Sequence, residues 1–215
     1  MLPMTLLRIF AQSRIRGPAE ASESRQENPS NPMARRPRFN ERKATQVAAR
    51  ILASVGGRMP YLSLMKLMYF IDRAALLRWG TPLTNDAYFS MDNGPVLSRV
   101  KDLMTEEDPA PGFWSHHISS PTNYRVELID EAGNDQLSPA EERLIDEIVS
   151  ENRGLDRWKL VEKSHKLPEW KHPNGSSTSI EIDDILEAGG IGAKQREEMV
   201  RELESVRRVQ ALLVD

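Results

Sequence analysis

One 20-residue stretch constrains the fold of this chain more than any other: YLSLMKLMYFIDRAALLRWG, residues 61–80. Its apolar side chains would lie nearly all round a helix, and a helix of that kind is buried rather than placed on a surface. Gly80 is suited to end the helix, because glycine readily takes the left-handed conformation at a helix C-terminus. We therefore expect a buried central helix over about residues 61–79.

The few polar residues of this stretch are its informative ones. Lys66, Tyr69 and Arg73 are spaced i, i+3 and i+7, so they share one helical stripe, and Asp72 lies beside it. Charged groups in a buried helix either form structural ion pairs with flanking elements or mark a functional site. The residues alone leave both interpretations open.

The segments on either side predict a mainly α (α+β) fold, a compact helical domain around the central helix with a small antiparallel hairpin or sheet. Asn40, Ser138 and Asp156 are good helix N-caps, and Ser138 begins a capping box with Glu141. Helices are predicted over 41–55, 95–104, 139–153, 157–166, 180–188 and 192–213. Strands are predicted over 86–91, 113–119 and 123–129, the last two forming a hairpin.

A tight turn, Asp92-Asn93-Gly94-Pro95, joins the strand over 86–91 to the helix over 95–104. Gly94 allows a positive φ, and Pro95 suits the first position of a helix. An anion could bind at such a helix start, but the turn holds a single glycine and lacks the phosphate-loop pattern. We expect a rigid structural corner here.

The N-terminal segment differs from the rest in composition. Residues 1–38 hold seven Arg and three Glu, a net charge of +4, so the remaining residues carry −7 of the total of −3. Residues 18–32 are rich in Ser, Glu, Pro and Asn, which is typical of disorder. We hypothesise that translation starts at Met33. The predicted organisation is a disordered extension over 1–38, a domain over 39–190 and an amphipathic C-terminal helix over 191–215.

No arrangement of residues indicates catalysis, a cofactor or a metal site. The chain has no cysteine, so disulfides and thiolate chemistry are excluded, and a reducing cytoplasm is the expected location. His116 and His117 are neighbours on a predicted strand and would face opposite ways, while His165 and His172 lack metal-site spacing. The acidic domain disfavours nucleic acid as a partner, although a basic arm at 35–38 leaves operator binding as a minor alternative. No apolar run is long enough for a membrane span.

Three blocks together resemble the Panacea domain, which is typified by SocA-like antitoxins of bacterial and phage toxin–antitoxin systems. Residues 66–86, KLMYFIDRAALLRWGTPLTND, are similar to its K-L-x-Y-x-x-D … G-x-P-(I/L)-T pattern. Tyr88, Met91 and Gly94-Pro95-Val96 are similar to Y-x-A-x-x-x-G-P-V, with Ser90–Asn93 departing from the usual spacer. Residues 160–171, LVEKSHKLPEWK, are similar to L-S-H-x-x-P-x-W. The blocks occur in the family's order across roughly residues 40–190.

The resemblance implies a binding module rather than an enzyme: an antitoxin that neutralises a cognate toxin, encoded by a neighbouring gene, through direct protein contact. The signature residues carried over by position are Lys66, Tyr69, Asp72, Gly94, Pro95, His165, Pro168 and Trp170. Whether they contact a partner or maintain the scaffold stays open. Candidate interface anchors are Trp114, Trp170, Tyr88 and Arg73, because aromatic residues and Arg dominate binding energies.

Besides operator binding, two further alternatives remain. The resemblance also allows a proteolytic adaptor that delivers the toxin to the ClpXP protease, with the N-terminal arm or residues 212–215 engaging the protease. A small enzyme would use Lys66, Asp72 and His165 as its polar centre. That alternative requires the three side chains to converge in a cleft that solvent reaches.

Overall fold

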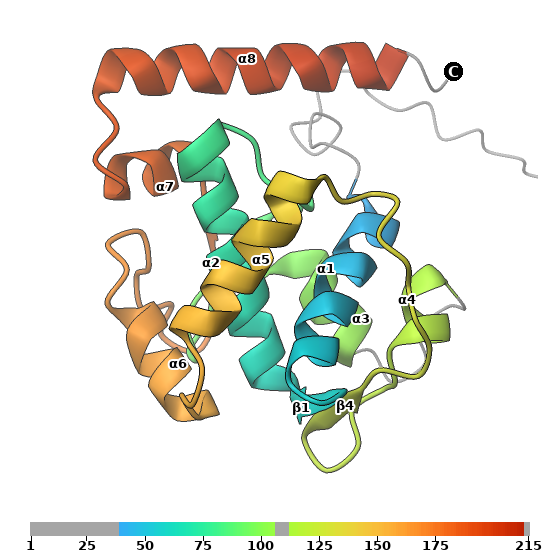
Figure 1. Cartoon of the computed structure of the whole chain (residues 1–215). Coiled ribbons are helices and arrows are strands. Elements are labelled where there is room, and N and C mark those ends of the chain that lie inside the picture. The colour runs from blue at the N-terminus through green and yellow to red at the C-terminus, as the bar shows by residue number, and fades with distance from the viewer. Residues whose placement is uncertain (1–38, 106–111, 213–215) are drawn as a thin grey trace, which may run out of the picture. The chain divides into compact units, whose positions relative to one another are not determined.

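A computed structural model describes residues 39–105 and 112–212 (Figure 1). The expectations for residues 1–38, which include the start at Met33 and the basic arm at 35–38, lie outside the described residues. So do those for the loop at 106–111 and for residues 213–215.

The described part of the chain is mainly helical with a small antiparallel β component, which confirms the predicted fold class. Its helices are α1 (Glu41–Ser54), α2 (Tyr61–Trp79), α3 (Ser98–Thr105), α4 (Phe113–His117), α5 (Pro139–Glu151), α6 (Arg157–His165), α7 (Ile182–Ala188) and α8 (Ala193–Leu212). Its strands are β1 (Arg58–Pro60), β2 (Tyr88–Ser90), β3 (Val96–Leu97), β4 (Arg125–Glu127) and β5 (Thr178–Ile180).

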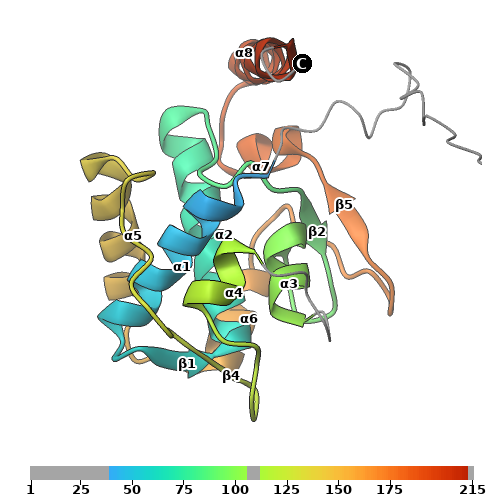
Figure 2. The same cartoon turned by 90° about the vertical axis from the view of Figure 1, so that its right-hand side faces the viewer.

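Helix α2 is the central helix that the apolar run predicts. Twelve of its 19 residues are buried, and α1, α3, α5, α6 and α7 all contact it. Figure 2 shows α1 and α5 on one side of α2, with β2 and β5 on the other. Gly80 ends the helix in the left-handed conformation, with φ of 76°, and its N–H donates to the Leu76 carbonyl at 2.9 Å.

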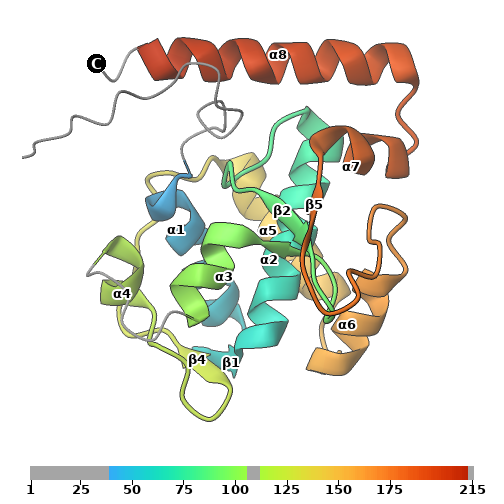
Figure 3. The same ribbon diagram turned by 180° about the vertical axis from the view of Figure 1, so that it is seen from behind.

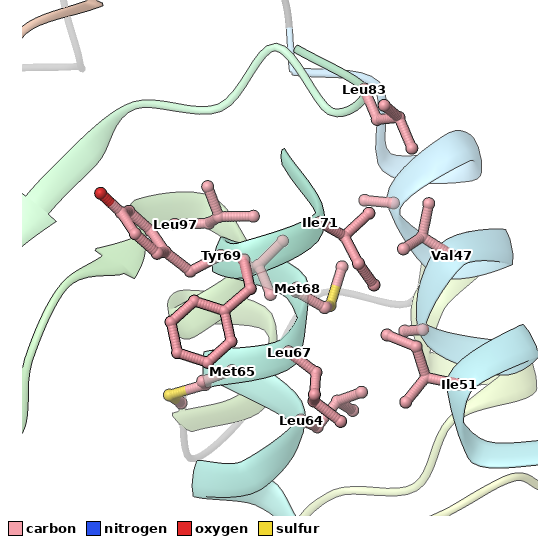
Figure 4. Packing of buried hydrophobic residues seen from close by; sticks show 14 of the residues in the cluster. Val47, Ile51, Leu64, Met65, Leu67, Met68, Tyr69, Ile71, Leu83 and Leu97 are labelled. Carbon is pink, nitrogen blue, oxygen red and sulfur yellow. The ribbon is translucent and has the colours of Figure 1, made fainter. Parts of the chain in front are cut away.

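The hydrophobic core surrounds α2 on both sides. Val47 and Ile51 of α1 face Met68 and Ile71 of α2, as Figure 4 shows, and all four side chains are at most 1% exposed. On the opposite side of α2, Tyr69 points toward the segment around β3. Because both sides of α2 are covered, its polar residues must find partners inside the protein.

The predicted N-caps are all present. The Asn40 side chain accepts from the Lys43 N–H at 3.0 Å, and the Asp156 side chain accepts the N–H groups of Trp158 and Lys159 in the first turn of α6. At the start of α5, Ser138 and Glu141 form the reciprocal capping box. These caps depend on local chemistry alone, which is why sequence predicts them.

The strands form two small antiparallel sheets. One pairs β1 with β4, in the register Met59↔Val126. The other has the order β3-β2-β5, in which Tyr88 pairs with Leu97 on one side and Ile180 on the other. Strand β5 covers the edge of β2 that β3 leaves open.

The strand predicted over 113–119 is wrong, because this segment begins with the short helix α4. Trp114 and Ile118 are 3% and 1% exposed and lie four residues apart, so a helical turn buries both of them. The Glu41 carboxylate, in the first turn of α1, accepts the Trp114 N–H at 2.9 Å. His116 and His117 are therefore successive helix residues, not strand residues on opposite faces, and β1 is the main partner of β4.

The helix predicted over 95–104 begins later, so the position expected for Pro95 is also wrong. Residues 96–97 form β3, and α3 starts at Ser98. The Asp86 carboxylate fixes this start, because it accepts the N–H groups of Arg99 and Val100 at 3.0 and 2.9 Å. Pro95 precedes a strand, while Gly94 does have the expected positive φ, at 92°.

The C-terminal helix α8 contacts α7, and the Met199 side chain of α8 lies next to Gly80. The division into a domain over 39–190 and a helix over 191–215 stays a prediction. Across the described residues, no helix combines the length and the apolar character that a membrane crossing requires.

Candidate functional site

Segments far apart in the sequence meet beside α2 and bring the predicted site residues together. The turn that follows β2 and the C-terminal end of α6 both lie against α2, and Figure 3 shows β2, β5 and α6 around it. We call this group the α2 polar cluster; it consists of Lys66, Tyr69, Asp72, Arg73, Tyr88, Gly94, Pro95, His165, Pro168 and Trp170 together with Glu169.

Lys66 is fully buried, and its ammonium group secures the turn after β2. Its Nζ donates to the Pro95 carbonyl at 2.7 Å. No carboxylate in the described part of the chain forms an ion pair with it. Burial therefore lowers the pKa of Lys66 to about 7, since the charged form is costly away from water.

Gly94 is required at the point where three segments approach most closely. Its φ of 92° is one that side-chain-bearing residues rarely adopt, and its N–H donates to the Met91 carbonyl at 2.8 Å. A Cβ at position 94 would overlap Ser164 Oγ of α6 and lie 3.1 Å from Lys66 Nζ. The turn therefore packs directly on α2 and α6.

The end of α6 is held on this turn by two aromatic rings. His165 stacks on Trp170 with ring centroids 3.9 Å apart, and Trp170 Nε1 donates to the Met91 carbonyl at 3.1 Å. Burial lowers the pKa of His165, and its Nε2 is buried without a hydrogen-bond partner among the described residues. Pro168, which is exposed, lies in the loop between the two rings.

Glu169 binds the middle of α2, and sequence reasoning missed it. Its buried side chain accepts from Tyr69 Oη at 3.0 Å and from Arg73 Nε at 2.6 Å. Burial, followed by the neighbouring Glu169 charge, raises the pKa of Tyr69 well above its usual value, so Tyr69 remains a donor. The only sequence signal for Glu169 is its place between Pro168 and Trp170.

Asp72 holds the connection that follows α2. One carboxylate oxygen accepts the N–H groups of Leu83 and Thr84 at 2.8 and 2.9 Å, and the other accepts from Tyr88 Oη at 2.8 Å. Burial raises the pKa of Asp72, while these hydrogen bonds act to lower it. Asp86, also missed from the sequence, has a pKa raised to about 6 by burial.

The arrangement does not provide the solvent-reached cleft that the enzyme alternative requires. Lys66 and Asp72 have no exposed surface, and each is bonded to a different backbone segment. His165 lies near Lys66, whereas the partners of Asp72 are in another set, around Tyr88. The cluster joins α2 to three loops, through Lys66, Tyr69 and Asp72.

Exposure separates the predicted residues into a buried and an accessible set. Lys66, Tyr69, Asp72, Tyr88, Gly94 and Pro95 are buried, Arg73, His165 and Trp170 are half-buried, and Pro168 is exposed. Among the candidate interface anchors, Trp114 and Tyr88 are only 3% exposed and belong to the core. Arg73 and Trp170 keep some surface near the cluster.

Comparison with known proteins gives one informative result. Residues 64–171 match the family described as antitoxin SocA-like, Panacea domain, and this range holds all ten predicted site residues and half of the chain. Neither the curated proteins nor the solved structures provide a match. The chain therefore belongs to the SocA-like antitoxin family with a Panacea domain.

Proposed function

We propose that this protein is an antitoxin that neutralises one cognate toxin in the cytoplasm by direct protein–protein binding, without catalysis. The main observation that supports the proposal is the family match over residues 64–171. The geometry agrees with it, because the ionisable groups at the family's signature positions on α2 are committed to bonds inside the fold.

The bonds that those groups make support a binding role rather than catalysis. Lys66, Tyr69 and Asp72 each tie a different segment to α2, so they stabilise a scaffold whose outer surface is free to recognise a partner. Members of such a family can share a scaffold and still select different partners through surface residues. We therefore assign the signature residues to the scaffold and expect partner contacts elsewhere.

The test has two stages and uses the full chain in its native host. Tagged protein is purified and its partners are quantified by mass spectrometry, with an unrelated tagged protein as the control. Each stoichiometric partner is then expressed alone and together with this chain. The proposal expects one partner, encoded by a neighbouring gene, that stops growth alone and is tolerated in the presence of this chain.

Other outcomes reassign the function. Recovery of a Clp protease, with loss of the toxin over time after synthesis is blocked, would identify an adaptor that delivers the toxin for degradation. If no enriched partner is toxic, or if toxicity persists on co-expression, the antitoxin proposal is refuted.

A further inference from the structure

A cavity of about 440 Å³ shares no lining residue with the α2 polar cluster. Its lining comes from the connection between α5 and α6 and from the starts of β1 and α2, and Figure 1 labels these elements. Its lining includes the buried side chains of Met59, Leu67 and Leu160. Two further lining residues, Val55 and Trp158, are 42% and 56% exposed. We call it the Trp158 pocket. Large apolar side chains that gather at the opening of an apolar cavity mark an interaction site, whereas isolated ones do not.

An arginine stands beside this opening, between two aromatic rings. The Arg157 guanidinium carbon lies 5.2 Å from the Trp158 ring centroid and 5.9 Å from that of Tyr124. No carboxylate in the described residues forms an ion pair with Arg157. The rings therefore orient the guanidinium while its N–H groups stay available to a partner.

Tyr124 is held in an unusual conformation that places its ring at this surface. Asn123 and Tyr124 both have positive φ, 51° and 61°, in a two-residue turn between Thr122 and Arg125. The second position of such a turn favours glycine, so tyrosine is unfavourable there for folding alone. Tyr124 is 68% exposed, and its ring stacks on that of Tyr61 with ring centroids 6.5 Å apart.

The charges at the pocket define the kind of partner segment that fits. Two arginines line it, Arg153 and Arg157, and among the lining residues the single carboxylate is that of Asp156. The Asp156 carboxylate already accepts the N–H groups of Trp158 and Lys159 at the start of α6. The pocket is therefore locally basic on an acidic domain, and it complements a carboxylate. The N-terminal segment of this chain, with its charge of +4, does not.

We propose that the Trp158 pocket is the docking site for the toxin, and that it receives an apolar side chain of the toxin while Arg157 pairs with an adjacent carboxylate. The inference rests on the proposed antitoxin function and names the surface that performs it. Tryptophan, tyrosine and arginine are the residue types that carry most of the energy of protein interfaces, and all three meet here.

The experiment compares substitutions in the pocket with matched substitutions elsewhere. Trp158→Ala and Arg157→Glu change the pocket. Trp79→Ala and Arg143→Glu remove an exposed tryptophan and reverse an exposed arginine outside its lining. All four full-length variants are used as bait in the native host, after circular dichroism and melting confirm that they fold, and the toxin dissociation constant is then measured.

Each pocket variant should weaken toxin binding by roughly 30-fold or more, and each control should stay within about 3-fold of wild type. A photo-reactive residue at Val55 should cross-link to a toxin segment with neighbouring apolar and acidic residues. Equal toxin binding by all four variants would overturn the pocket assignment and leave the antitoxin function intact. A basic cross-linked segment, or a wild-type dimer that Trp158→Ala dissociates, would also overturn it. If wild type enriches no toxin, both proposals fail.

Discussion

Replacing Gly94 with alanine tests the central claim about the α2 polar cluster, that the turn after β2 packs directly on α2 and α6. Two costs are expected. The φ of 92° strains any residue with a side chain, which costs about 1–2 kcal/mol. The new methyl group would also overlap Ser164 Oγ and crowd Lys66 Nζ, which costs roughly 1–3 kcal/mol more. Gly94→Ala should therefore lower the free energy of unfolding by about 2–5 kcal/mol.

Gly56 offers a matched control. Its φ of 89° is nearly the same, but a Cβ there would meet no atom within 4 Å. Gly56→Ala should therefore show only the strain, about 1–2 kcal/mol. Urea denaturation followed by circular dichroism measures both values, and the difference between them isolates the packing contribution.

A double mutant locates the overlap. Ser164→Ala removes the Oγ atom that the new methyl group would meet, at the expense of the bond from Ser164 Oγ to the Val161 carbonyl. Combined with Gly94→Ala, it should recover about 1–2 kcal/mol relative to the sum of the single changes. The close packing at Gly94 is refuted if Gly94→Ala lowers the free energy of unfolding no more than Gly56→Ala does. It is also refuted if the effects of Gly94→Ala and Ser164→Ala on the free energy of unfolding are additive in the double mutant.

Two further predictions concern the buried charges of α2. Asp72→Ala leaves two backbone N–H groups and the Tyr88 hydroxyl without their acceptor. It should lower the free energy of unfolding by about 3–5 kcal/mol, whereas Tyr88→Phe should lower it by roughly 1–1.5 kcal/mol. Equal costs in urea denaturation would mean that Asp72 does not hold the connection after α2. For Lys66, the pKa falls from 10.5 in the unfolded chain to about 7 in the fold, so the unfolded state binds more protons between these values and stability rises with pH. From pH 7 to pH 9, the free energy of unfolding of the wild type should rise by about 2 kcal/mol relative to that of Lys66→Met. This pH interval lies above the pKa of Asp86. Parallel stability profiles for the two proteins would contradict the lowered pKa of buried Lys66.

Features determined by neighbours in the chain could be predicted from sequence. The buried helix α2 follows from its apolar run, and the caps at Asn40, Ser138 and Asp156 follow from residue types at fixed spacing. The positive φ of Gly94 was predicted for the same reason. Short elements were harder: the apolar residues of α4 fit an alternating pattern as well as a helical one, and only burial against α1 decides between them.

The candidate site also combines features that local sequence predicts with features that depend on tertiary packing. The family blocks, the helical spacing on α2 and the choice of interface anchors directed attention to ten residues that the fold does bring beside α2. None of these signals could reveal which of the ten are buried. Glu169 and Asp86 were missed because an acidic residue in a loop ordinarily faces solvent. Their roles depend on long-range packing, which places Glu169 against Tyr69 and Asp86 at the start of a helix 12 residues later.

The pairing of β5 with β2 determines where this chain can be truncated without loss of its fold. The family match ends at residue 171, before β5, and begins at residue 64, after α1 and within α2. A fragment cut at those limits would lose Val47 and Ile51 from the core and expose the backbone edge of β2 to other chains. The packed core and the sheet of this chain thus extend beyond the range that the family match covers. The flanking segments cover α2 and close a strand edge, so the protein depends on residues outside the matched range.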